Sequence, residues 1–177
     1  MTTTTQRRLF NGWRIAGWGS LLALLLLPAF AMQFTGEVDW TASDFVFAAL
    51  LLGFLGGCVE LAVRFGKGRL GTLGYIIAGL AAFLTMWANA AVGIIGDDNS
   101  PVNPGFFLMV TGGFALAAIA RFRPAAMRWI AFALAAGQFV IGFAALLLMP
   151  GHAIEWGGLA FFALLWSAAG WCFHRAA

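Results

Sequence analysis

The amino-acid sequence predicts an all-α integral membrane protein, a bundle of six transmembrane helices with its N- and C-termini in the cytoplasm. The chain has 177 residues, of which 62% are hydrophobic and only 10% are charged. Ordinary soluble domains carry roughly 25% charged residues. A chain this short has too much surface for its volume to hide so many apolar side chains from water. The apolar residues also form long runs. If these runs cross a membrane in turn, all the basic residues fall on the same side of it.

The spans follow from the length of the apolar runs. A membrane-crossing helix needs about 20 mostly apolar residues, because the hydrocarbon core is ~30 Å thick and each helical residue rises ~1.5 Å. A β-barrel would show alternating polar and apolar residues instead, and the run 21–27 does not alternate. Charge, Gly and Pro separate the runs, and the fourth run is the shortest. We expect one transmembrane domain over 1–177 with spans at about 13–34, 42–65, 73–95, 105–120, 127–149 and 154–173.

The ten basic residues decide the orientation, because Lys and Arg collect on the cytoplasmic side of a membrane. They precede span one, separate spans two and three, separate spans four and five, and follow span six. They are Arg7, Arg8, Arg14, Arg64, Lys67, Arg69, Arg121, Arg123, Arg128 and Arg175. The acidic residues fall on the opposite side, with Glu60 as the exception. We therefore expect both termini in the cytoplasm.

The N-terminal segment also resembles a secretory signal. Arg7 and Arg8 precede an apolar stretch, and residues 29–31 imitate a cleavage site. The apolar stretch continues through Phe34, however, and is long enough to span a membrane. We favour an uncleaved first helix.

Stripes of small residues at helical spacing predict how the helices pack. Close backbone approach through small residues holds helices together in lipid. We expect these stripes to face the bundle interior and Leu and Phe to face lipid. Gly53 and Gly57 form a GxxxG pair, for which internal packing is the favoured role. The stripes are Gly12, Ala16, Gly19 and Ala23; Ala49, Gly53 and Gly56 or Gly57; Ala78, Ala82, Thr85, Asn89 and Gly93; Ala131, Ala135, Gln138, Gly142 and Ala145; and Ala160, Ala163, Ser167 and Gly170.

Glu60 is the most unusual residue, because an ionisable group inside a span is costly and is a functional candidate by default. Arg64 lies four residues later on the same helix face, which is the favourable order for an ion pair. We favour a structural Glu60–Arg64 pair over a proton relay.

A polar cluster is expected on the outer side. Asp39 and Asp44 lie around the start of span two, Asp97 and Asp98 follow span three, and Asn89 lies two turns inside span three. Carboxylate oxygens suit hard cations. The favoured interpretation is nevertheless a solvated loop with a turn at 97–99 and a cap on span four from the Asn103-Pro104 pair. The intramembrane amides of Asn89 and Gln138 are expected to bond between helices.

The sequence indicates no catalytic, cofactor-binding or metal-ligating residue. None of the usual zinc, nucleophile or phosphate-loop motifs occurs. His152 is expected on the outer side and His174 on the inner side, so the two cannot ligate one haem iron together. The identity of any cofactor stays open. Cys58 and Cys172 should be free thiols, because both lie towards the reducing side.

Three stretches resemble a group of small uncharacterised bacterial inner-membrane proteins. They are residues 31–40 (AMQFTGEVDW), residues 90–97 (AAVGIIGD) continuing to Asn103, and residues 119–124 (IARFRP). The resemblance implies a multi-pass protein of the bacterial inner membrane. It supplies no activity and no catalytic residue.

Two functions are compatible with these patterns. The leading hypothesis is a non-enzymatic accessory or interaction subunit of a membrane complex, whose partners are the lipid bilayer and other membrane-protein subunits. The alternative is a small transporter or channel for a cation or small solute, in which the outer acids form a funnel and Glu60 a relay. The scattered basic residues form no patch for nucleic acid.

Overall fold

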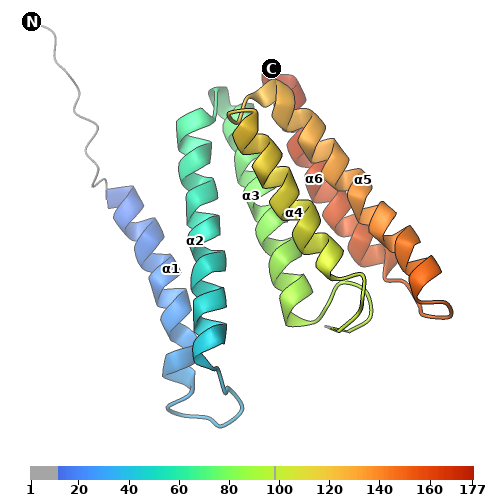
Figure 1. Cartoon of the computed structure of the whole chain (residues 1–177). Helices are drawn as coiled ribbons and strands as arrows, with labels where there is room; N and C mark the ends of the chain where they lie inside the picture. The colour runs from blue at the N-terminus through green and yellow to red at the C-terminus, as the bar shows by residue number, and fades with distance from the viewer. Residues whose placement is uncertain (1–11, 98) are drawn as a thin grey trace, which may run out of the picture. The chain divides into compact units, whose positions relative to one another are not determined.

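A computed structural model describes residues 12–97 and 99–177, and these residues form six α-helices (Figure 1). The predicted all-helical fold is thus confirmed. Five of these helices are long and apolar enough to cross a membrane, and α4 is shorter. The helices are α1 (Gly12–Ala31), α2 (Ala42–Phe65), α3 (Gly68–Ala91), α4 (Pro104–Ile119), α5 (Pro124–Leu148) and α6 (Trp156–Ala176).

The helix ends differ from the predicted spans by a few residues, and α3 differs most. It begins at Gly68, five residues before the predicted span. The apolar run alone set the predicted start, and the helix also includes the more polar residues that precede this run. It ends at Ala91 because Gly93 adopts a left-handed backbone conformation with φ +75°. Prolines occupy the first turns of α4 and α5, where the missing N–H costs nothing. The 16 residues of α4 span about 24 Å.

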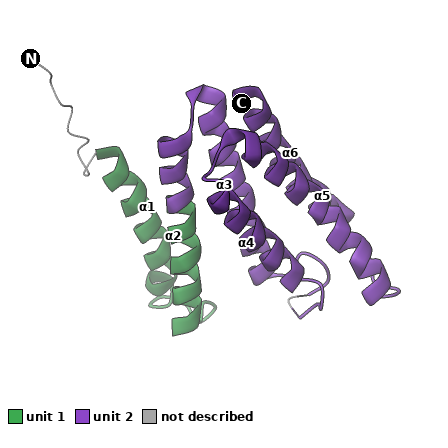
Figure 2. Cartoon of the chain, turned by 45° about the horizontal axis from the view of Figure 1, so that its top comes forward, with its two compact units in different colours: residues 1–56 green, residues 57–177 purple. Residues whose placement is uncertain are grey.

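The chain divides into two compact units, which are described separately (Figure 2). Unit 1 covers residues 1–56 and unit 2 covers residues 57–177. The helix α2 contributes its first part to unit 1 and its last part to unit 2.

In unit 1, α1 packs on α2 through large side chains and not through its small ones. A Cβ atom on Gly56 would lie 2.7 Å from the Trp18 ring and 3.0 Å from Leu21, so α2 offers the small residue. Trp18 and Leu21 lie on the side of α1 roughly opposite to the stripe of Gly12, Ala16, Gly19 and Ala23, since each residue turns the helix by about 100°. All four stripe residues are exposed. Within unit 1, α2 therefore does not cover this stripe, and its predicted orientation toward the bundle interior stays a prediction.

In unit 2, α6 packs closely against both α5 and α3, and α4 packs against α5 and α3. A Cβ atom on Gly142 of α5 would lie 2.6 Å from Leu159 of α6, and one on Gly74 of α3 would lie 2.9 Å from Phe173. The prediction that small residues line these interfaces is confirmed for spans three and five. The buried members are Ala78, Ala82, Thr85, Asn89, Ala131, Ala135, Gln138, Gly142 and Ala145.

The prediction that Leu and Phe face outwards holds only in part. Phe106, Leu159 and Phe173 are fully buried, because large side chains fill the space that facing glycines leave open. Other large side chains are strongly exposed, with Leu147 at 83% and Ile119 at 80%. A surface this apolar is unfavourable in water.

The contacts within unit 2 separate its charges into two ends. At one end the Tyr75 hydroxyl donates to the Phe122 carbonyl, and Arg128 Nη1 lies 3.4 Å from His174 Nδ1. The loops and helix ends gathered here carry Arg64, Lys67, Arg69, Arg121, Arg123, Arg128 and Arg175, and we call this the basic end.

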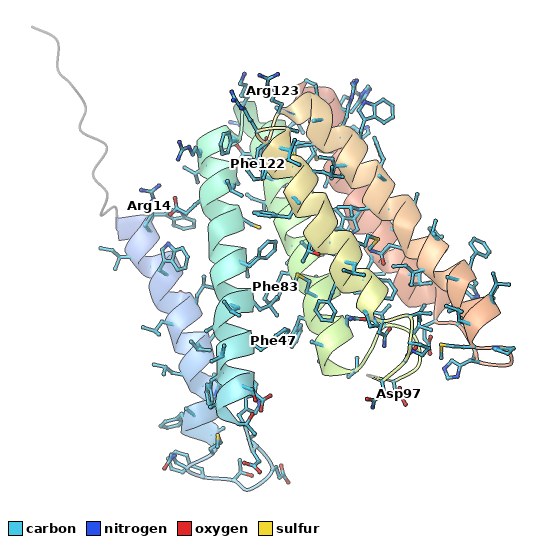
Figure 3. All side chains as sticks on the ribbon, in the orientation of Figure 1. Arg14, Phe47, Phe83, Asp97, Phe122 and Arg123 are labelled. Atoms are coloured by element: carbon cyan, nitrogen blue, oxygen red, sulfur yellow. The ribbon has the colours of Figure 1, made fainter. Side chains whose placement is uncertain are left out.

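The opposite end of unit 2 carries Asp97 and Glu155, and we call it the acidic end. There the Gly96 N–H donates to Glu155 Oε2 at 3.4 Å, and the Ser100 hydroxyl lies 3.2 Å from Met149 Sδ. Figure 3 shows Phe122 and Arg123 at one end and Asp97 at the other.

The close approach at Gly142 yields a test of the packing. Gly142→Val would push into the buried Leu159 and into Trp156, whereas Gly112 has nothing within 4 Å of an added Cβ. We expect Gly142→Val to lower the free energy of unfolding in detergent by about 1–3 kcal/mol more than Gly112→Val does. The two variants carry the same change in helix propensity, so equal losses in a thermal or denaturant unfolding assay would contradict this packing.

Candidate functional site

A partly buried loop at the acidic end is the most elaborate polar feature of unit 2. Residues 92–103 connect α3 to α4, and within them Ile95 is 0% exposed, Asn103 2% and Val102 5%. Ile95 and Val102 belong to a core cluster with Phe106 and Leu159. Backbone N–H and C=O groups that are buried in a protein are almost always paired with other polar groups. The loop therefore needs internal hydrogen-bond partners.

Asn103 supplies these partners. Its Nδ2 donates to the Asp97 carbonyl at 2.7 Å, and its Oδ1 accepts from the Ile95 N–H at 3.2 Å. Asn89 Nδ2, on α3, donates to the Asn103 carbonyl at 3.0 Å. One asparagine thus holds the loop closed on itself, and a second ties the loop to α3.

Gly93 makes this loop conformation feasible. Its φ of +75° lies in the left-handed region that residues with a Cβ rarely adopt. A Cβ there would also collide with the Asp97 carbonyl and lie 2.6 Å from Asn103 Nδ2. The chain can therefore leave α3 and turn tightly under Asn103 only because this residue is glycine.

The sequence-based role of Asn103 needs correction. Asn103 does stand at the N-cap position before Pro104, but its side chain makes no capping hydrogen bond to α4. Its backbone is helical, with φ −61° and ψ −36°, so the side chain is free to bond to the loop. A capping asparagine would instead have extended backbone angles.

The acidic residues of this end also serve the loop. Asp97 Oδ1 accepts from the Asn99 N–H at 3.0 Å, which is the turn predicted at 97–99. Glu155 Oε2 accepts from the Gly96 N–H. Asp98 lies outside the described residues.

The other two candidate acids belong to unit 1. Asp44 accepts from the Thr41 N–H at 2.7 Å and from the Thr41 hydroxyl at 2.8 Å, an arrangement that caps the start of α2. Asp39 is exposed. Among the described residues, no three His, Cys, Asp or Glu side chains gather in a way that could hold a metal ion.

Glu60 and Arg64 lie on the part of α2 that belongs to unit 2. Glu60 is half-buried and Arg64 is exposed, with the Arg64 guanidinium 5.6 Å from the centroid of the Phe65 ring. That cation–π contact anchors Arg64 at the basic end. The Glu60–Arg64 ion pair stays a prediction.

Buried polar side chains continue from Asn89 into the centre of unit 2. Thr85 and Gln138 are 0% exposed and Trp166 is 4% exposed. The contacts of Gly142 with Leu159, and of Gly74 with Phe173, set the register of α5 and α3 against α6. This register places Thr85, Gln138 and Trp166 within about one helical turn of one another along the bundle.

These central groups can make hydrogen bonds, but none of them is an acid or a base near neutral pH. Thr85 donates to the Ala81 carbonyl at 2.7 Å. Both amide atoms of Gln138, Oδ1 of Asn89 and Nε1 of Trp166 have no hydrogen-bond partner in the described part of the chain. Amides, hydroxyls and indoles do not titrate near neutral pH. Instead of the expected bond between helices, Asn89 bonds to the loop residue Asn103 directly before α4, and Gln138 has no hydrogen-bond partner among the described residues.

The histidines and cysteines occupy separate places in unit 2. His152 lies beside Gly96 at the acidic end and His174 beside Arg128 at the basic end, so they stand apart as predicted. Cys58 and Cys172 are buried free thiols, which confirms the predicted state.

Sequence reasoning gave Asn103 the role of a helix cap and did not single out Trp166. The signal for the observed role of Asn103 is its position directly before a helix-starting proline, between the apolar residues Val102 and Phe106. The signal for Trp166 is weaker, because a tryptophan in the middle of an apolar span differs from the tryptophans near the ends of spans only in its position along the helix.

The loop geometry predicts the effect of removing the Asn103 side chain. Asn103→Leu keeps the volume but leaves the Ile95 N–H and the Asp97 carbonyl unpaired in a buried site. We expect a loss of about 1–3 kcal/mol in the free energy of unfolding and faster hydrogen exchange across residues 92–102. Exchange in α5 measured in the same sample serves as the internal control. Unchanged exchange in the loop would contradict the role of Asn103.

Comparisons with known proteins found no matching family model, no matching curated protein and no matching solved structure. The resemblance to small bacterial inner-membrane proteins stays a prediction.

Proposed function

We propose that this chain is a non-enzymatic, multi-pass protein of the bacterial inner membrane that serves as an accessory subunit of a membrane complex. Its apolar helices and their exposed side chains, such as Leu147 and Ile119, are compatible with a lipid environment. The basic end of unit 2 would face the cytoplasm and the acidic end the periplasm, in keeping with the positive-inside rule.

The observation that carries the accessory role is the small-residue face of α1 that α2 leaves uncovered within unit 1. Within unit 1, α2 buries no residue of α1 among those described. Gly12 and Gly19 have nothing within 4 Å of an added Cβ, and Ala16 and Ala23 are exposed beside them. A helix that faces only lipid gains nothing from such a stripe. Small residues favour close approach of a second helix.

The interior of unit 2 supports the accessory role over transport. A cation pathway from Asp97 to the bundle centre would use Asn89 as its intermediate polar group. Asn89 is 3% exposed, and the hydrogen bond from its Nδ2 to the Asn103 carbonyl holds the side chain against the loop, although its Oδ1 has no hydrogen-bond partner among the described residues. The apolar cluster of Ile95, Phe106 and Leu159 fills the same region. These contacts favour a rigid scaffold.

A matched pair of variants on α1 tests this proposal. Gly19→Leu puts bulk on the small-residue face, whereas Gly17→Leu puts the same bulk on another face, and both glycines have open space around them. We expect the wild type and Gly17→Leu, extracted from native membranes in mild detergent, to migrate as a complex larger than the monomer on native gels. Gly19→Leu should migrate as the free chain, because close helix contact is lost.

The accessory role would be contradicted if the wild-type chain migrated alone or if Gly19→Leu kept the complex intact. It would also be contradicted if mass spectrometry found only copies of this chain in the complex. The last result would make α1 a self-association helix.

A further inference from the structure

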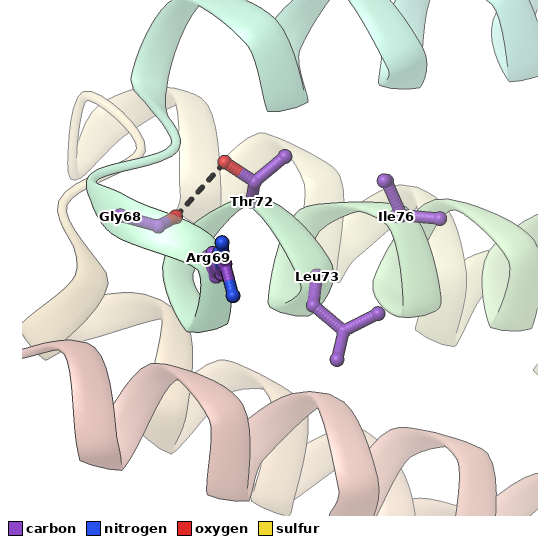
Figure 4. A pocket seen from close by; sticks show the side chains of 5 residues that line it. All are labelled: Gly68, Arg69, Thr72, Leu73 and Ile76. Atoms are coloured by element: carbon purple, nitrogen blue, oxygen red, sulfur yellow. Dashed lines mark hydrogen bonds between the residues drawn. The ribbon is translucent and has the colours of Figure 1, made fainter.

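An open groove of about 620 Å³ runs along the first turns of α3 in unit 2 (Figure 4). Gly68, Arg69, Thr72, Leu73 and Ile76 line it. Its size falls in the roughly 300–1,000 Å³ range of ligand sites. The groove is open along one side, as expected for a surface that receives part of a long molecule.

The groove begins at a cationic group. Arg69 is exposed and stands among the residues of the basic end. Three other arginines of this end place their guanidinium groups over aromatic rings, namely Arg64 over Phe65, Arg128 over Trp129 and Arg175 over Trp171. Arg69 makes no such ring contact and no ion pair with the other described residues, so its guanidinium is available to a ligand.

The groove continues into an apolar wall. Leu73 is 44% exposed and Ile76 is 45% exposed. The Thr72 hydroxyl donates to the Gly68 carbonyl at 3.0 Å, which uses up its hydrogen on its own helix (Figure 4). From Arg69 to Ile76 the helix rises about 10 Å. A ligand that fills the groove therefore meets a positive charge at one end and only hydrocarbon about 10 Å away.

We propose that this groove binds an anionic phospholipid, with the phosphate at Arg69 and an acyl chain against Leu73 and Ile76. The proposal rests on the membrane location proposed above. Charge decides the class of lipid, because Lys67 directly precedes the groove and Arg175 adjoins Ala176, whose Cβ would lie 3.5 Å from a Cβ on Gly71. Among the described residues, Glu60 is the one acidic side chain near this end. Basic pockets on the cytoplasmic side of helix bundles are suited to anionic head groups.

The test compares two lipids that share the same acyl chains. The full chain, purified in mild detergent, is titrated with phosphatidylglycerol or with phosphatidylcholine, and bound lipid is counted by native mass spectrometry. We expect the wild type to prefer phosphatidylglycerol and Arg69→Gln to weaken that binding about fivefold, since one basic residue is lost. Arg123→Gln is the matched control, because it removes the same charge from the same end but lies outside the groove.

Two further variants make the outcome decisive. Arg69→Lys should keep the preference, and Ile76→Trp, which fills the apolar wall, should weaken binding of both lipids. Equal binding of the two lipids by the wild type, or an equal loss in Arg69→Gln and Arg123→Gln, would overturn the lipid site. Release of the chain from membranes by alkaline carbonate would instead refute the membrane location itself.

Discussion

The close approach of α6 to α5 and α3 is the constraint on which the rest of unit 2 depends. Gly142 of α5 leaves room for Leu159 of α6, and Gly170 of α6 leaves room for Phe132 of α5. Gly74 of α3 leaves room for Phe173 of α6. Because each contact joins a glycine to a large side chain, the helices can slide little without a clash. The register that results places Thr85, Gln138 and Trp166 at one level in the centre. It also brings Arg128 to His174 at the basic end and Gly96 to Glu155 at the acidic end.

The need to pair buried backbone N–H and C=O groups with hydrogen-bond partners explains the structure of the acidic end. In the loop that leads to α4, Ile94, Ile95, Ser100, Val102 and Asn103 are buried, so the backbone there needs partners within the protein. Asn103 closes its hydrogen bonds from within, and Asn89 ties it to α3. The polar residues of this end therefore hold the architecture together. The basic end has the opposite character, because several of its basic side chains, Arg69 among them, are exposed and remain available to molecules outside the chain.

Much of this fold could be predicted from the sequence. Helix formation in an apolar chain depends on the length of each apolar run and on the Gly, Pro and charged residues that separate the runs. The proline starts of α4 and α5 and the small-residue faces of α3 and α5 follow from such local patterns. The sequence does not indicate which helix the stripe on α1 faces, because a small-residue face fits a neighbouring helix equally well whether that helix belongs to the same unit, to the other unit or to another chain. The local sequence does not say that Trp18 fills the space above Gly56.

The polar contacts were harder to predict for a related reason. Asn103 and Asn89 are 14 residues apart, and their contact exists only after α3, the loop and α4 have closed on each other. A local pattern can indicate a cap at Asn103-Pro104 but cannot indicate this closure. Asp44, in contrast, bonds to Thr41 three residues away, yet composition alone grouped it with the acidic cluster.

The central claim is that the charge-separated bundle crosses a membrane with its basic end in the cytoplasm. Cysteine accessibility tests it most directly, in a background where Cys58 and Cys172 are replaced by alanine. A membrane-impermeant maleimide should label Asn99→Cys in intact cells, and should label Lys67→Cys only after the inner membrane is permeabilised. Labelling of Lys67→Cys in intact cells, with Asn99→Cys protected, would contradict the account.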